Sequence, residues 1–156
     1  PSPHDAHHGH EVVGRAVTAA LRGDDGVRWW AWALWGHLPL TSLIHPVDAG
    51  TMQVAVTALA AYRGENERND YRRLLAGGSE AAAVLGPERV FGFGTSRVSD
   101  LPYASLFLEL EARGGSWETC SPGVLDVTSV RAGRAPTGHV AAWLDEPSPY
   151  ASPHSP

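Results

Sequence analysis

The chain has 156 residues, a formal net charge of −5, six tryptophans and one cysteine, and all twelve of its basic residues are arginine, so it is lysine-free. This length suits one domain. The net negative charge gives no sign of the cluster of positive residues that binding to nucleic acids or anionic membranes requires. A single cysteine excludes an intrachain disulfide bond. We therefore expect no nucleic-acid or membrane partner, and a cytoplasmic location or a place within an assembly rather than a disulfide-rich secreted protein.

Both ends of the chain have the composition of flexible tails. Residues 1–9 are rich in histidine and proline, and residues 147–156 contain four prolines, which oppose helix and strand pairing. Residues 10–146 contain the periodic apolar patterns. The sequence therefore predicts a single globular domain at residues 10–146 between two extended tails.

The first predicted element is a helix from about His10 to Arg22, because valines, alanines and Leu21 recur at four-residue spacing. The next segment, Arg28 to Leu38, contains four tryptophans and fits a strand or a helix. Its shortness and aromatic content favour a buried strand. Thr51 to Tyr62 alternates apolar and semi-polar residues, which predicts a further strand.

The rest of the pattern predicts two short helices followed by strands. The helices are expected at residues 65–76, ended by Gly77 and Gly78, and at residues 80–85. Strands are expected at 89–97, 105–112, 116–120, 124–130 and 138–144, with a hairpin turn at residues 113–116. A leading helix, a mostly antiparallel sheet of five to six strands and two inserted helices define the α+β class.

The N-terminal segment contains many potential metal ligands. His4, His7, His8 and His10, together with Asp5, place imidazole and carboxylate donors within seven residues. A metal site also needs ligands that are held in fixed positions. Because this segment is predicted to be a tail, we expect no metal site and no bound cofactor.

Three short motifs suggest one catalytic alternative. Arg63 ends a predicted strand, Gly94-Thr95-Ser96 lies in a second, and Glu109-Leu110-Glu111 lies in a third. In this order they resemble the arginine, serine and Glu-x-Glu motifs of ADP-ribosyltransferases. The resemblance implies an NAD-dependent enzyme in which Arg63 holds the phosphates, Ser96 braces the nicotinamide side and Glu111 activates the acceptor.

The tryptophan-rich segment suggests a binding function. Trp29, Trp32 and Trp35 are spaced so that they could form one surface, and tryptophan is a favoured anchor at protein interfaces. The chain has no convincing catalytic set apart from the three motifs. The sequence therefore favours a non-catalytic protein-binding or assembly module, such as an accessory or structural subunit of a larger assembly (a virus particle, for example), whose partner is another protein or a second copy of this chain.

Overall fold

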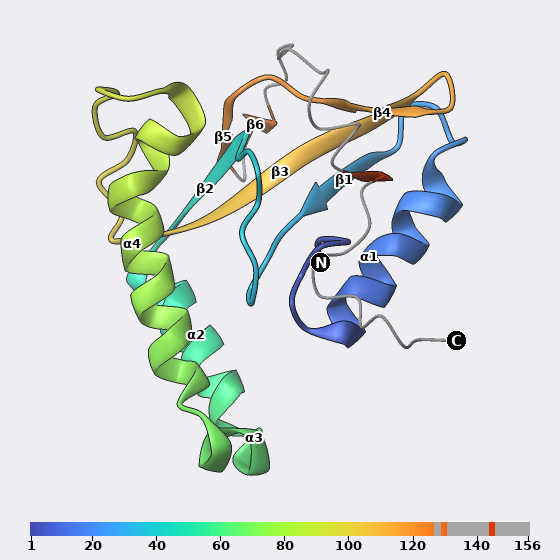
Figure 1. Ribbon diagram of the computed structural model, residues 1–156. Coiled ribbons are helices and arrows are strands. Elements are labelled where there is room, and N and C mark those ends of the chain that lie inside the picture. The colour runs from blue at the N-terminus through green and yellow to red at the C-terminus, as the bar shows by residue number, and fades with distance from the viewer. Residues whose placement is uncertain (127–128, 131–143, 146–156) are drawn as a thin grey trace. The chain divides into compact units, whose positions relative to one another are not determined.

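Figure 1 presents the computed structural model of the protein, which describes residues 1–126, 129–130 and 144–145. The helices described are α1 (His8–Leu21), α2 (Ala49–Ala60), α3 (Arg63–Arg68) and α4 (Tyr71–Phe91). The strands described are β1 (Arg28–Ala31), β2 (Leu43–Val47), β3 (Tyr103–Arg113), β4 (Ser116–Thr119), β5 (Gly123–Asp126) and β6 (Ser129–Val130). An N-terminal helix and a mostly antiparallel sheet confirm the predicted α+β class. Among the described residues, no helix combines the length and the apolar character needed to cross a membrane.

The chain divides into two compact units. Of the described residues, the first contains 1–42, 107–122 and 144–145, and the second contains 43–106, 123–126 and 129–130. The single domain expected at residues 10–146 stays a prediction. The tail expected at 147–156 lies outside the described residues, as does the strand expected at 138–144 except for Leu144.

The first unit is a three-stranded antiparallel arrangement with α1 packed on one face (Figure 1). Strand β3 pairs with β1 on one side and with β4 on the other. Alternate residues of the three strands are buried together against α1, as period-two burial requires. This apolar core contains Trp29, Ala31, Leu108, Leu110, Ala112 and Trp117, with Val17 and Leu21 of α1 packed against it. The helix predicted at residues 10–22 is confirmed by α1.

The N-terminal segment differs from the flexible tail that was expected at residues 1–9. Ser2 and Asp5 are fully buried, and the backbone N–H of Ser2 donates to the carbonyl of Trp32. Gly14 of α1 allows this packing, because a Cβ there would lie 2.5 Å from the backbone of Ser2 and Pro3. The spacing of apolar residues could not predict that this segment is ordered, because polar contacts hold it in place.

The strand predicted at Thr51 to Tyr62 is wrong, because these residues form α2. Asp48 caps the helix, and its side chain accepts the backbone N–H of Thr51. The segment is rich in alanine, the strongest helix former. Alanine and threonine can lie on a buried or on an exposed face, so the alternating pattern in this segment was weak evidence for a strand.

The strand predicted at Arg89 to Arg97 is also wrong, as is the helix end predicted at Gly77 and Gly78. Helix α4 runs through both glycines and through Pro87 as far as Phe91, and Gly92 ends it with a φ of 105°. Gly86 lets α4 approach β2, since a Cβ there would lie 2.6 Å from Cδ1 of Ile44. Packing of Gly86 against Ile44 therefore stabilises the C-terminal part of α4, near Pro87.

The hairpin predicted around residues 113–116 is confirmed by β3 and β4. Gly114 and Gly115 have φ values of 55° and 76°, which is the conformation that a two-residue turn of this kind needs. In the second unit, β2 pairs parallel with β5, and β5 pairs antiparallel with β6. The strand expected at 124–130 is thus observed as β5 and β6.

Candidate functional site

The three residues of the predicted NAD site do not form one cluster within a unit. Arg63 begins α3 at one end of α4, whereas Ser96 follows the other end of α4 (Figure 1). Helix α4 has 21 residues, which corresponds to a length of about 30 Å. Glu111 belongs to the other unit, where both of its carboxylate oxygens accept from the Arg113 guanidinium at 2.9–3.0 Å. Arg63 and Ser96 therefore lack the proximity that a shared nucleotide cleft requires.

The three tryptophans of the predicted binding surface differ in their surroundings. Trp29 is buried in the core of the first unit, where its ring lies 5.6 Å from that of Trp117. Trp32 is half-buried beside the His10 imidazole. Trp35 is 40% exposed. The strand expected from Arg28 to Leu38 ends at Ala31, so these tryptophans do not share one face.

The most constrained polar group near the N-terminus is the Asp5 carboxylate, which is fully buried. Its Oδ1 accepts the backbone N–H of His7 at 3.0 Å, and its Oδ2 accepts those of Leu34 at 2.8 Å and Trp35 at 3.4 Å. Burial alone would raise the pKa of Asp5. The backbone N–H donors of His7, Leu34 and Trp35 outweigh it, with a smaller electrostatic contribution from the neighbouring His10, so the pKa lies below the ordinary value. Asp5 is therefore a carboxylate at neutral pH.

One imidazole lies beside this carboxylate, and a second lies beside the first. Nδ1 of His10 is 3.4 Å from Oδ1 of Asp5, and the side chain of His10 remains 27% exposed. The rings of His7 and His10 are 4.7 Å apart, and Trp32 lies edge-on to His10 at 5.1 Å. His8, in contrast, is 87% exposed and lies 3.7 Å from Glu11. The described residues contain no group of three or more His, Cys, Asp or Glu arranged to hold a metal ion.

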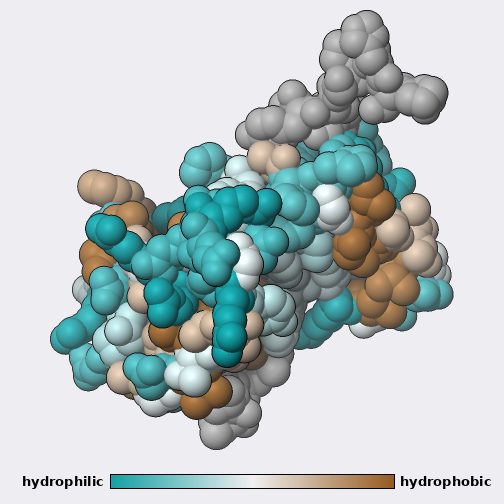
Figure 2. Space-filling model, turned by 90° about the horizontal axis from the view of Figure 1, so that it is seen from below, coloured by the Kyte–Doolittle hydropathy of each residue, from teal (hydrophilic) through white to brown (hydrophobic). Residues whose placement is uncertain are grey.

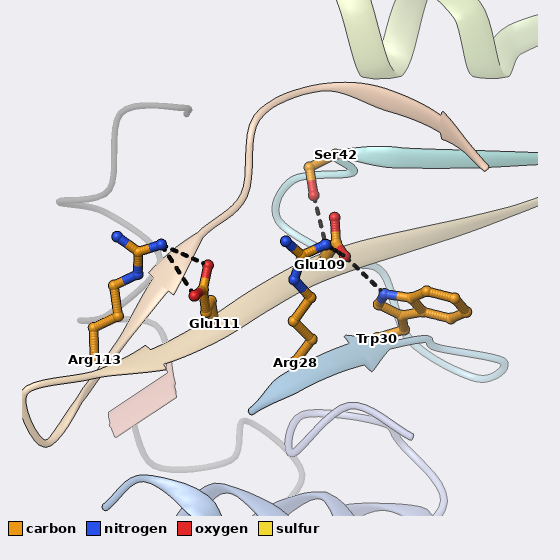
Figure 3. A network of polar contacts seen from close by, with 6 residues as sticks. All are labelled: Arg28, Trp30, Ser42, Glu109, Glu111 and Arg113. Carbon is orange, nitrogen blue, oxygen red and sulfur yellow. Dashed lines mark hydrogen bonds and ion pairs between the residues drawn. The ribbon is translucent and has the colours of Figure 1, made fainter. Parts of the chain in front are cut away.

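A second polar cluster lies on the face of the first unit's strands that is opposite α1 (Figure 3). Glu109 of β3 is only 1% exposed, and its Oε1 accepts from Trp30 Nε1 at 3.0 Å. The same oxygen lies 3.4 Å from the Arg28 guanidinium, and the Glu109 backbone N–H donates to Ser42 Oγ. Glu109 therefore has a buried and paired carboxylate.

Cys120 lies directly across from Glu109, whose carbonyl accepts the Cys120 backbone N–H at 2.9 Å. The thiol is buried. Burial, followed by the negative charge of Glu109, raises the pKa of Cys120 to about 11. Since the thiolate is the reactive form, this cysteine is poorly suited to nucleophilic chemistry.

Comparisons with protein-family models, curated proteins and solved structures found no match for this chain. Candidate sites are therefore ranked on geometry alone. The Asp5, His7 and His10 group combines fixed geometry with accessible imidazole, whereas the Glu109 cluster is internally paired. The sequence contained the histidines, but it did not predict the backbone hydrogen bonds that hold the Asp5 carboxylate in place beside His10.

Proposed function

We propose that this protein is an enzyme whose reaction centre is formed by Asp5, His7 and His10, and that it catalyses a hydrolysis or a group transfer. The observation that carries the proposal is the buried Asp5 carboxylate, which three backbone N–H groups hold 3.4 Å from Nδ1 of His10. A buried carboxylate on one imidazole nitrogen orients the ring and presents the other nitrogen to a substrate.

The chemistry follows from which nitrogen carries the proton. The proposed reaction uses the His10 tautomer with the proton on Nδ1, the nitrogen that lies 3.4 Å from Oδ1 of Asp5 and makes no hydrogen bond to the described residues. Nε2 of His10 is then an acceptor that can take a proton from a water molecule or a hydroxyl group. The second imidazole, His7, lies 4.7 Å away and can donate a hydrogen bond to the oxygen on which negative charge develops.

The same arrangement supports a second candidate, in which His10 binds a divalent metal ion. Histidines that bind metals usually donate their other ring N–H to a carboxylate or a carbonyl. Nδ1 of His10 lies 3.4 Å from the Asp5 carboxylate, which places a carboxylate on the corresponding side of the ring. Zinc accepts imidazole ligands and activates water. Such a site would need ligands beyond this histidine pair, since the described residues offer no complete set.

One experiment separates these candidates. Hydrolysis of p-nitrophenyl acetate is measured with and without added Zn²⁺ for the wild type, His10→Gln and His8→Gln. We expect His10→Gln to lose about 100-fold of the catalysed rate, the scale of general acid–base catalysis, while the exposed His8→Gln keeps it. A rate that requires Zn²⁺ favours the metal site. Equal rates for the wild type and His10→Gln under both conditions would overturn the proposal.

The binding module predicted from the sequence stays a second proposal. It is supported by large apolar side chains at the surface, such as Trp30 at 37% and Trp35 at 40% exposure. Figure 2 likewise shows apolar residues in separate patches on the face seen there. Light scattering of the purified chain tests self-association: a concentration-independent monomer would leave only a different protein as partner.

A further inference from the structure

We infer that the loop after β1 forms an apolar wall of the Asp5–His10 centre, and that Leu34 and Trp35 in it bind an uncharged aromatic or aliphatic group of the substrate. This inference rests on the proposed function and names the substrate class of the same site. It uses residues of the first unit only.

The first step is that the loop is attached to the centre. The backbone N–H groups of Leu34 and Trp35 both donate to Oδ2 of Asp5, the carboxylate whose other oxygen faces His10. Gly36 of the loop packs against the N-terminal segment, since a Cβ at residue 36 would lie 3.0 Å from the carbonyl oxygen of His4. Two hydrogen bonds and one close backbone contact therefore fix the loop beside the imidazoles.

The second step concerns the side chains that this loop carries. Leu34 is 45% exposed and Trp35 is 40% exposed, although both are large and apolar. Trp32, at the start of the loop, contacts the His10 ring directly. Residues 29–40 contain no acidic residue, no arginine and one histidine, so no fixed charge of this segment would repel an apolar group.

The third step is the consequence for a ligand. A group that reacts at Nε2 of His10 would have a carboxylate behind the imidazole and an uncharged wall beside it. Burying an apolar substituent against Leu34 and Trp35 is favourable, whereas a charged substituent would lose hydration there and would find no arginine, lysine or carboxylate in the loop to pair with. The centre therefore suits a neutral polar group that is attached to an apolar one.

The test compares benzamide with acetamide, two probes that share a neutral amide and differ by the aromatic ring. Binding is followed by NMR, using the Trp35 indole N–H and the His10 imidazole signals of the full chain. We expect benzamide to shift both signals and acetamide, at the same concentration, to shift neither. Trp35→Ser and Leu34→Ser should each weaken benzamide binding about tenfold, which is the scale of one lost apolar contact.

Leu40→Ser is the matched control, because Leu40 is 37% exposed in the same segment and none of its backbone groups is seen bonded to Asp5. It should leave the benzamide affinity unchanged. If benzamide shifts the Trp35 signal and leaves the His10 signal unchanged, the inference is overturned, because the probe then binds to a surface separate from the centre. The absence of any shift overturns it as well. Because His10→Gln retains the wall, it should still bind benzamide, so loss of ester hydrolysis and loss of probe binding report on the two proposals separately.

Discussion

The first unit holds two buried carboxylates, Asp5 and Glu109, whose charges are satisfied in different ways. Asp5 accepts three backbone N–H groups and leaves the neighbouring His10 imidazole partly exposed. Glu109 accepts from the side chains of Trp30 and Arg28, so its partners are committed to it. A carboxylate that the backbone satisfies can orient a reactive group, whereas one that side chains satisfy mainly joins strands. This comparison identifies the Asp5 group as the candidate centre.

The largest expected effect comes from Glu109→Ala. This change removes the buried acceptor that the partly exposed Arg28 guanidinium and Trp30 indole N–H share, and it leaves a cavity in its place, which should lower the free energy of unfolding by about 3 kcal/mol. Urea denaturation followed by circular dichroism measures it. The hydrolysis rate of the folded fraction should stay unchanged, and a specific loss of that rate would place Glu109 in the reaction centre.

Asp5→Asn should lower the free energy of unfolding by about 2 kcal/mol, because an amide cannot accept all three backbone N–H groups. The folded pKa of Asp5 is depressed, so its stabilisation is complete above the ordinary value of 3.8 and is lost as the pH falls through the folded pKa. The difference between the wild type and the variant should therefore be constant near neutral pH and narrow in acid. If the free energies of unfolding of the wild type and the variant differ by the same amount at neutral and at acidic pH, the charge of the Asp5 carboxylate contributes nothing to stability.

The contrast between the two carboxylates also shows where sequence patterns were sufficient. The alternation of Leu108 and Leu110 placed β3 correctly, and the paired Gly114 and Gly115 placed its turn, because those signals depend on neighbours in sequence. The same alternation places Glu109 on the opposite face of the strand from Leu108 and Leu110. Its burial was missed, because the partners Arg28 and Trp30 are about 80 residues away.

The candidate centre was missed for a related physical reason. The sequence showed that His7 and His10 could act as metal ligands. Whether they could form a functional site depended on whether the N-terminal segment is held in a fixed position. The N-terminal segment is held by the backbone N–H groups of residues 34 and 35, which donate to Asp5. Almost every residue has a backbone N–H group, so the amino-acid composition does not show which of them will make such a bond. Asp5 followed by His10 five residues later, near the start of an amphipathic helix, was the available signal.

Trp30→Phe should have a smaller effect, about 1 kcal/mol, since it removes one hydrogen bond to Glu109 while keeping an aromatic ring near Phe107. A double-mutant cycle with Glu109→Ala gives the sharper measurement, because the cost of Trp30→Phe should nearly vanish when Glu109 is absent. If the two costs simply add, the indole bond contributes nothing and Arg28 alone satisfies the carboxylate.

The smallest effect concerns reactivity rather than stability. A rise in the pKa of Cys120 from 9.0 to about 11 lowers its thiolate fraction about 100-fold at neutral pH. Iodoacetamide should therefore label the native protein far more slowly than the urea-unfolded chain, as followed by mass spectrometry. Glu109→Gln should speed native labelling modestly, since it removes the second largest cause of the raised pKa while burial, the largest, remains. Native labelling as fast as that of the unfolded chain would mean that the Glu109 side of the strands is open to reagents, and the division between a closed Glu109 cluster and an accessible His10 centre would then fail.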